Sequence, residues 1–266
     1  MLLTAFLNRL RLANYRPRTV HSREMVLNAF AATLPGDLRD ATRLDVEAFL
    51  ARDLAPETRR NYLQALRSFY RWCIAEEYLT VDPTAKVPSV RVRKGSPRPI
   101  DTDDLTRAVN SAPPRMRAWL LLMSLAGLRC MEVANLRPVD LMESDGELLL
   151  FLRETKGGGT ATVPAHPQIV ESLMFLPQYD GLWWDVSAHR VTVATGEYLR
   201  SVGITCGAHA LRHAAATSWL RASGEDLLTT SRLMRHASVA TTQTYTQLVA
   251  KRPAEVVNLV PYLRAV

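Results

Sequence analysis

The sequence predicts a mainly α-helical protein with a small antiparallel β-sheet, built as a helical N-terminal domain followed by an α+β domain. Three observations predict it. Apolar residues recur at helical spacing along most of the 266 residues, one glycine-rich turn separates two strand-like runs, and a proline-rich stretch divides the chain. We therefore expect an N-terminal domain at 1–85, a basic linker at 86–99 and a second domain at 100–266.

Four helices are expected in the N-terminal domain, over residues 2–13, 19–34, 43–52 and 56–77, with Thr19 as the N-cap of the second. In the fourth, one face carries the apolar residues Leu63, Leu66, Phe69, Tyr70 and Cys73. Another face carries the polar residues Arg60, Gln64, Arg67 and Arg71. Arginines and amides on one face suit the DNA major groove and its phosphates, and they suit an ordinary solvated surface equally well.

The proline-rich stretch PTAKVPSVRVRKGSPRP, residues 83–99, includes Arg91, Arg93 and Lys94. Proline discourages helix, so an extended basic linker is expected, which could follow a phosphate backbone. Residues 1–99 hold 17 Lys and Arg against 10 Asp and Glu, whereas the remainder holds 16 of each sign. The excess positive charge therefore lies in the N-terminal part. It favours a nucleic-acid partner, with a merely soluble basic surface as the alternative.

The composition argues against membrane and secreted classes. No apolar stretch is long enough to span a bilayer, and arginines interrupt the apolar start of the chain, which lacks a small-residue cleavage site. Three scattered cysteines are typical of a reducing compartment. We expect a cytoplasmic protein without a membrane partner.

The second domain should open with a helix capped by Thr102, followed by an apolar helix over 115–127 that ends at Gly127. A short helix over 129–136 comes next. The runs GELLLFLRET and TATVPAH are expected to be strands of one hairpin, joined at KGGG. Most of the remaining sequence has a helical pattern.

The stretch HALRHAAATSWL, residues 209–220, places His209, Arg212 and His213 on one face of a helix that begins after Gly207. Unpaired backbone N–H groups and the helix dipole favour an anion at such a position. Zinc binding that also used Cys206 is disfavoured, because Arg212 would place a permanent positive charge beside the metal. A purely structural cluster of a buried arginine with two histidines is the other alternative.

Further candidate residues lie elsewhere in the second domain. Arg129 follows a glycine turn, and Glu132 is placed one helical turn later, where it can orient the guanidinium. Lys156 lies at the hairpin tip and is one of only four lysines; unlike arginine, a lysine can release a proton near neutral pH. His236 and Tyr245 lie nine residues apart in a threonine-rich segment. Each of these residues alone has an ordinary structural explanation.

Together, in this order and spacing, the residues resemble the tyrosine recombinase, or phage integrase, family. The matching elements are GLRCMEV, the hairpin lysine, HALRH, the histidine before ASVATT, and the tyrosine that follows. The resemblance covers about residues 1–250. It implies that 1–85 is a core-binding domain, that 100–266 is the catalytic domain, and that the arm-binding domain of lambda-type integrases is absent.

The resemblance also implies a mechanism. Tyr245 would attack a DNA phosphodiester and become a 3′-phosphotyrosine, while Arg129 and Arg212 stabilise the charge that develops on the phosphate. Lys156 would protonate the departing 5′ oxygen. His209 would accept or relay the tyrosine proton.

Other residues have lesser roles in this scheme. His236 would hydrogen-bond the phosphate, with Glu132 and His213 as supports. No cofactor and no metal is expected, since the two arginines take the place of metal ions. In the family, glycine usually precedes the last histidine, whereas this chain reads LMRH. If that position needs a positive φ, Arg235 would be strained there.

The expected partners are double-stranded DNA crossover sites and further copies of the chain. The synaptic complex would be a homo-tetramer, and the free protein could be a monomer. The tail PAEVVNLVPYLRAV would either dock on a neighbouring subunit or fold back. We expect integration or excision of a phage or mobile element. The alternatives are a chromosome-dimer resolvase of the Xer type, a type IB topoisomerase, and a non-catalytic DNA-binding protein of the same fold.

Overall fold

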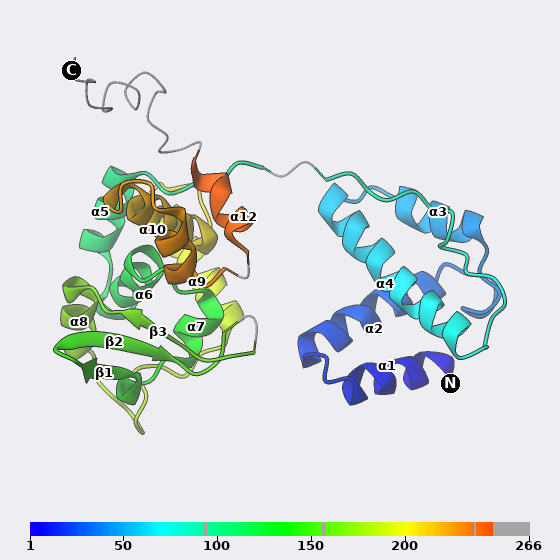
Figure 1. The fold of residues 1–266 in the computed structure, drawn as a ribbon, viewed down its shortest axis with the longest axis horizontal. Helices are drawn as coiled ribbons and strands as arrows, with labels where there is room; N and C mark the ends of the chain where they lie inside the picture. The colour runs from blue at the N-terminus through cyan, green and yellow to red at the C-terminus, as the bar shows by residue number, and fades with distance from the viewer. Residues whose placement is uncertain (93–94, 156–157, 237, 247–266) are drawn as a thin grey trace, which may run out of the picture. The chain divides into compact units, whose positions relative to one another are not determined.

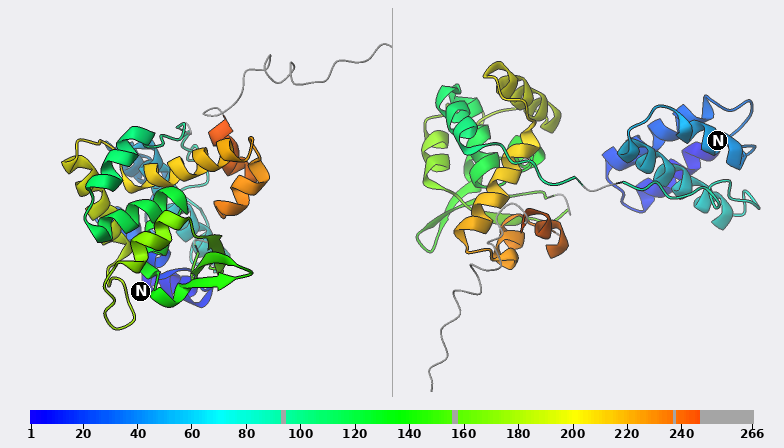
Figure 2. Two further views of the ribbon diagram at one scale, coloured as in Figure 1. Left: turned by 90° about the vertical axis from the view of Figure 1, so that its left-hand side faces the viewer. Right: turned by 90° about the horizontal axis from the view of Figure 1, so that it is seen from above.

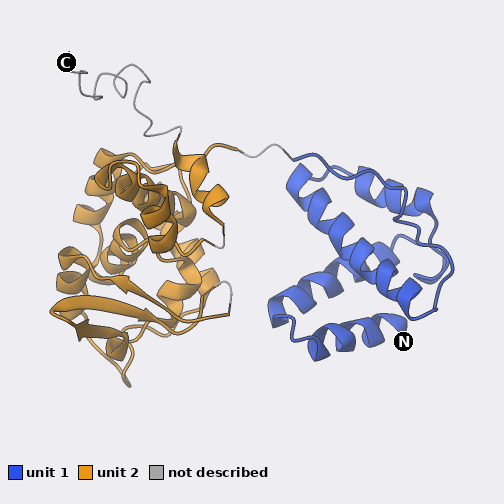
Figure 3. Cartoon of the chain, viewed as in Figure 1, with its two compact units in different colours: residues 1–94 blue, residues 95–266 orange. Residues whose placement is uncertain are grey.

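The computed structural model describes residues 1–92, 95–155, 158–236 and 238–246. The chain forms two compact units, Met1–Lys94 and Gly95–Val266, each with its own hydrophobic core (Figure 3). None of the described helices is long and apolar enough to cross a membrane.

Unit 1 is helical. Its described helices are α1 Leu2–Leu12, α2 Pro17–Ala31, α3 Arg43–Ala51 and α4 Pro56–Ala75 (Figure 1). The prediction that Thr19 caps the second helix is wrong, because α2 already begins at Pro17 with Arg16 as its N-cap. Proline suits the first helical position, where its missing N–H would have no partner in any case. Thr42 caps α3, accepting a hydrogen bond from the backbone N–H of Asp45.

The predicted apolar face of α4 forms the centre of the unit 1 core. Its members are buried: Leu63, Leu66, Phe69, Tyr70 and Cys73. The Tyr70 hydroxyl, buried with its ring, donates to the carbonyl of Leu38 at 2.8 Å. This bond provides the partner that a buried phenol requires.

Part of the stretch expected to be a linker packs on unit 1. Val87 is buried in its core, and Val90 packs against it. Arg67 of α4 donates from Nη2 to the Val87 carbonyl at 2.6 Å and from Nη1 to Ser89 Oγ at 3.2 Å. Because proline has no backbone N–H with which to form regular secondary structure, this stretch is held along α4 by the two hydrogen bonds from the Arg67 guanidinium.

Unit 2 combines helices with a small sheet, as predicted. Its described helices are α5 Thr102–Ser111, α6 Pro114–Leu125, α7 Cys130–Asn135, α8 Pro167–Met174, α9 Ala188–Ser201, α10 Ala208–Ala222, α11 Leu227–Leu233 and α12 Val239–Thr242, with 3₁₀ turns η1 Pro138–Asp140 and η2 Gln243–Tyr245. Helix α10 runs through the middle of the unit and packs on α6, and the segment with α11 and α12 lies at one end (Figure 2). The N-cap of α5 is Asp101 and not Thr102, since the Asp101 carboxylate accepts from the Asp103 N–H at 2.8 Å.

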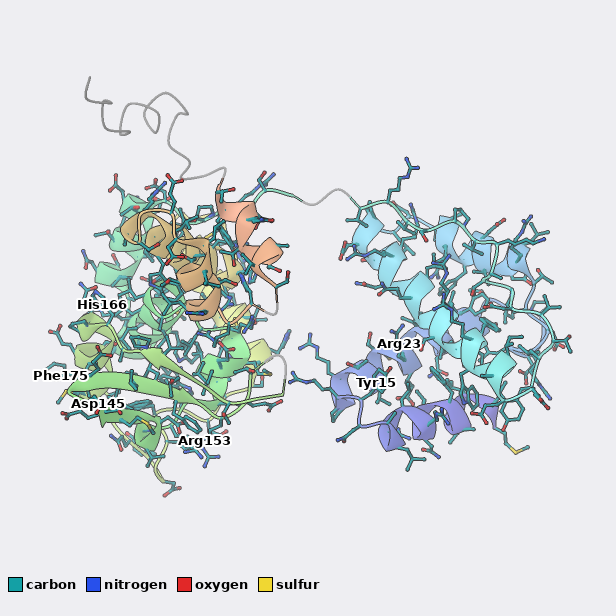
Figure 4. All side chains as sticks on the ribbon, viewed as in Figure 1. Tyr15, Arg23, Asp145, Arg153, His166 and Phe175 are labelled. Atoms are coloured by element: carbon teal, nitrogen blue, oxygen red, sulfur yellow. The ribbon has the colours of Figure 1, made fainter. Side chains whose placement is uncertain are left out.

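Three antiparallel strands form the sheet in the described residues: β1 Leu141–Ser144, β2 Glu147–Leu152 and β3 Ala161–Pro164, in that order across the sheet. The β2–β3 hairpin was predicted. Leu150 pairs with Val163 and Leu152 with Ala161, and the Leu150, Leu152 and Val163 side chains are buried. Arg153 (Figure 4), just after β2, pairs through Nη2 with the buried carboxylate of Asp140 at 2.7 Å.

The turn after α6 requires glycine. Gly127 has φ +57°, and a Cβ built there would lie 2.9 Å from the Trp219 ring and 3.3 Å from Met234 Sδ. A larger residue would meet both backbone strain and a side-chain clash. This close packing brings the residues after Gly127 against α10 and the end of α11.

Candidate active site

Helix α10 carries Arg212 into the interior of unit 2. Its run of alanines packs on α6, and Arg212 is only 2 % exposed. The guanidinium donates from Nη1 to the Gly127 carbonyl and from Nη2 to the Met234 carbonyl. A buried cation is tolerated only with such partners. Arg212 therefore ties the start of α10 to the turn after α6 and to the turn after α11.

Arg129 is held by a buried carboxylate. It is the N-cap of α7, and its backbone N–H donates to Glu132 Oε2 at 2.8 Å. Its Nη1 donates to the other carboxylate oxygen, Oε1, also at 2.8 Å. The Glu132 side chain is fully buried, whereas that of Arg129 is 21 % exposed. Glu132 thus orients Arg129, as the sequence predicted, and leaves part of the guanidinium open to a ligand.

Arg235 joins the same network, which the sequence did not predict. Its Nη2 donates to Glu132 Oε2 at 2.9 Å and to the Gly127 carbonyl at 3.1 Å, and its Nη1 donates to the Leu233 carbonyl at 2.8 Å. Its backbone φ is +52°. The condition under which the sequence places backbone strain on Arg235 is therefore met.

Tyr245 lies against α10. Its side chain packs with Ala216, Leu220 and Met234 and is 4 % exposed. Its hydroxyl lies 2.6 Å from Nδ1 of His213. The sequence assigned His213 only a supporting position, yet in the structure it is His213 that contacts the phenol. The segment α12–η2 places the tyrosine here, because Ser238 caps α12 and η2 continues it directly.

The other two histidines lie beside these residues. The ring of His209, one turn earlier on α10, has its centroid 4.5 Å from that of His213, edge to face. His236 follows Arg235, and its Nδ1 lies 2.8 Å from Thr242 Oγ1 of α12. Thr242 thereby links the turn after α11 to the segment that carries Tyr245.

The charges in this cluster are unequal. Burial, and then the neighbouring Arg129 and Arg235, lowers the pKa of Arg212 to about 9. Burial and the positive neighbours also lower the pKa of both His213 and His236 to about 4, so that both imidazoles are neutral at pH 7. The described cluster thus sets three guanidiniums against the single carboxylate of Glu132.

Burial raises the pKa of Tyr245, so its hydroxyl is protonated until a base removes the proton. A neutral imidazole within hydrogen-bond distance can take that proton. Guanidiniums with surplus positive charge bind an oxyanion, and phosphate oxygens match their donor geometry. A nucleophile, an adjacent base and an oxyanion site together suit transfer of a phosphoryl group onto the phenol.

Comparison with known proteins identifies the family. No family model matches the chain. The tyrosine recombinase XerC of Erythrobacter litoralis is 30% identical over 252 residues, which cover 86% of this chain and 81% of that protein. The chain belongs to the tyrosine recombinase family. It is therefore a site-specific recombinase. The tyrosine recombinase XerD of Caulobacter vibrioides is 29% identical over 254 residues, covering 84% of this chain and 82% of that protein.

Solved structures show that the recombinase has the expected fold. A lambda integrase dimer bound to a COC′ core site matches with a TM-score of 0.76 at 18% identity, covering 90% of this chain and 95% of the other. The XerH recombinase bound to palindromic difH, in a post-cleavage complex, matches with a TM-score of 0.71 at 17% identity, covering 92% and 81%. The predicted fold class is confirmed.

Some of the residues predicted to have a function lie outside the described residues: Lys156, Arg93, Lys94 and the C-terminal tail, residues 253–266. The others predicted as catalytic or supporting come together in unit 2, around the start of α10.

The predicted DNA-binding residues of unit 1 differ among themselves. Gln64 and Arg71 of α4 are exposed, as is Arg91. Arg60 pairs with Glu57 on the same helix, and Arg67 is engaged with residues 87–89.

In the described residues, no three His, Cys, Asp or Glu side chains gather as metal ligands would.

Proposed function

We propose that this recombinase integrates and excises a phage or other mobile element, by cutting and rejoining DNA through a 3′-phosphotyrosine at Tyr245. The observation that supports this most directly is the 2.6 Å contact between the Tyr245 hydroxyl and His213 Nδ1, with buried Arg212 as the preceding residue on α10. The nucleophile, a base and a phosphate-binding cation thereby converge from segments 32 residues apart.

In the cleavage step, Tyr245 Oη attacks the scissile phosphorus. The Oη–P bond forms, the bond from phosphorus to the 5′ oxygen breaks, and His213 takes the phenolic proton. Because a pKa of about 4 makes His213 a weak base, we assign it as a relay that passes the proton to His209, whose ring packs against it and which releases the proton to water. In the joining step a 5′-hydroxyl attacks the phosphotyrosine, which conserves the bond energy and needs no nucleotide.

The remaining roles follow from position. Arg129, partly exposed and oriented by Glu132, donates to a non-bridging phosphate oxygen. Arg212, which is buried, stabilises the negative charge that develops on the phosphate. His236 donates to the phosphate from the turn after α11. Lys156, which comes between β2 and β3 in the sequence and lies outside the described residues, is assigned to supply the proton to the departing 5′ oxygen.

The proposed partner is double-stranded DNA carrying crossover sites. Solved neighbours of the same fold are bound to a core site and to difH, and one is a lambda integrase tetramer on a Holliday junction. We assign residues 1–85 as the core-binding domain, with Gln64, Arg71 and Arg91 as its exposed polar candidates. A tetramer would assemble at synapsis, in the cytoplasm where the DNA lies.

A second candidate function is chromosome-dimer resolution of the Xer type. It is favoured by the curated relatives, which are named XerC and XerD. Sequencing the cleavage sites of the purified protein on DNA from its own host separates the two. Cleavage at the ends of an inserted element supports the first function, and cleavage at one chromosomal site that is independent of any element supports the second.

The chemistry is tested with a nicked suicide substrate, which traps protein on DNA in a denaturing gel. Wild type should form the adduct, and Tyr245→Phe should form none, while Tyr179→Phe, at an exposed tyrosine, should match wild type. Adduct formation should persist in EDTA, because the guanidiniums carry the role of metal ions. Adduct formation by Tyr245→Phe, or its complete loss with chelator, would contradict the proposal.

A further inference from the structure

Arg235 occupies a backbone conformation that disfavours any side chain. Its φ of +52° lies in the left-handed region, where glycine is the natural residue. Such conformations persist only where surrounding contacts offset their cost, and they gather at functional sites. The contacts of this arginine should therefore show what offsets the cost of its backbone conformation.

The side chain of Arg235 is 91% buried, since only 9% of it is exposed. It donates to the carbonyls of Leu233 and Gly127 and to the Glu132 carboxylate. Its Nε is buried and has no hydrogen-bond partner. A side chain that served stability alone would not be expected to bring an unsatisfied donor and an extra buried charge into the core.

These contacts connect both arginines that the proposed function places on the phosphate. Glu132 Oε2 accepts from Arg235 and from the backbone N–H of Arg129, and the Gly127 carbonyl accepts from Arg235 and from Arg212. The backbone of Arg235 leads directly into His236. The Arg235 side chain thus bridges three places: Glu132 of α7, the Gly127 carbonyl to which Arg212 also donates, and the turn before His236.

We propose that Arg235 is a positioning residue of the active site. It fixes Arg129 and Arg212 relative to each other through Glu132 and the Gly127 carbonyl, and it supplies the third positive charge that favours binding of an oxyanion beside them. The proposal rests on the proposed function, in which those two arginines hold the scissile phosphate.

The test compares variants on the suicide substrate at saturating protein. Arg235→Met keeps the bulk of the side chain and removes its charge and fork, and Arg235→Lys keeps the charge only. Arg235→Gly removes the backbone strain, which keeps the test valid should the methionine variant not fold. The matched control is Arg232→Met, at an exposed arginine on α11.

We expect Arg235→Met and Arg235→Gly to slow adduct formation by roughly 10²-fold, of the order seen when a transition-state donor is lost, with the Kd for DNA within about threefold of wild type. Arg235→Lys should be slowed less than these two variants, and the control Arg232→Met should form the adduct at the wild-type rate. Wild-type rates in both Arg235→Met and Arg235→Gly would overturn the proposal.

A second measurement does not depend on DNA cleavage. Inorganic phosphate should raise the Tm of the wild-type protein and of Arg232→Met, and Arg235→Met should lose at least half of that rise. If wild type forms no adduct on DNA, the proposed function fails while this measurement still decides the role of Arg235. A full phosphate effect in Arg235→Met, or none in wild type, would overturn it.

Discussion

The arginines of α4 and those around α10 show how differently one residue type is used in the two units. On α4, Arg71 is exposed and Arg60 pairs with Glu57 on the surface. At α10, Arg212 is almost completely buried, and it donates to two carbonyls, one in the turn after α6 and one in the turn after α11. A buried cation costs folding free energy that a surface cation does not. The arginines around α10, rather than those of α4, are therefore the ones that indicate a functional site.

Under the proposed function, the difference also separates two kinds of DNA contact. Exposed arginines contribute charge that holds DNA and is weakened by salt. Buried, bridged guanidiniums keep a fixed geometry at one phosphate, which is what stabilisation of a transition state requires. Substitutions matched between the two regions should therefore differ both in size and in the property that they affect.

The largest difference is expected for carboxylates. Glu132→Ala leaves Arg129 and Arg235 without their shared partner, which should lower the free energy of unfolding by about 3–5 kcal/mol. Glu57→Ala removes the exposed partner of Arg60 and should cost about 0–1 kcal/mol. Urea denaturation of both variants measures the difference. Equal losses would show that the buried network contributes no more to the free energy of unfolding than the surface ion pair does.

For arginines the expected difference lies in catalysis. Arg212→Met should lower the rate of adduct formation at saturating protein by roughly 10²- to 10³-fold. Arg71→Met, on α4, should leave that rate unchanged and instead weaken DNA binding by an amount that shrinks at high salt. Single-turnover cleavage and gel-shift titrations at two salt concentrations test this. A slow Arg71→Met enzyme would break the distinction between the two regions.

Acid should destabilise unit 2 through its neutral histidines. His213 and His236 have pKa values of about 4 when folded, against 6.5 as the ordinary value. Since the folded state disfavours the proton, their contribution is complete above pH 6.5 and is lost as the pH falls toward 4. We expect His213→Asn to reduce the fall in Tm between pH 7.5 and 4.5 by roughly 5 °C. The control His189→Asn, at an exposed histidine on α9, should keep the full wild-type fall.

The smallest effect is expected within α4. Arg67 donates to the Val87 carbonyl and to Ser89, so Arg67→Met should cost about 1 kcal/mol of unfolding free energy. Gln64→Met, on the exposed face, should change it by less than about 0.5 kcal/mol. Thermal unfolding compares the two. An identical Tm in both variants would mean that residues 87–89 do not depend on this contact.

Local features of the fold were predictable from sequence. The apolar face of α4 and the β2–β3 hairpin follow from short-range periodicity and turn glycines, and both are present in the structure. Strand β1 was missed because its four residues are mostly exposed and show no alternation. The cap at Thr19 was wrong because Pro17 takes the first helical position and Arg16 becomes the N-cap. The cap at Thr102 was wrong because Asp101, one residue earlier, caps the helix instead.

The contacts of the site were harder to predict. Order and spacing pointed to the residues themselves, but Arg235 and Glu132 are 103 positions apart and His213 and Tyr245 are 32 apart. No local rule links residues at such separations. The one usable signal was an arginine where the family pattern has glycine, which indicated backbone strain but gave no partner.

The most direct test of the central claim is to find the atom that carries the DNA. Adduct trapped on the suicide substrate is digested with protease and nuclease, and the nucleotide-bearing peptide is sequenced by mass spectrometry. We predict a nucleotide joined through its 3′-phosphate to Tyr245. A nucleotide on any other residue, or a 5′-phosphate linkage, would contradict the account.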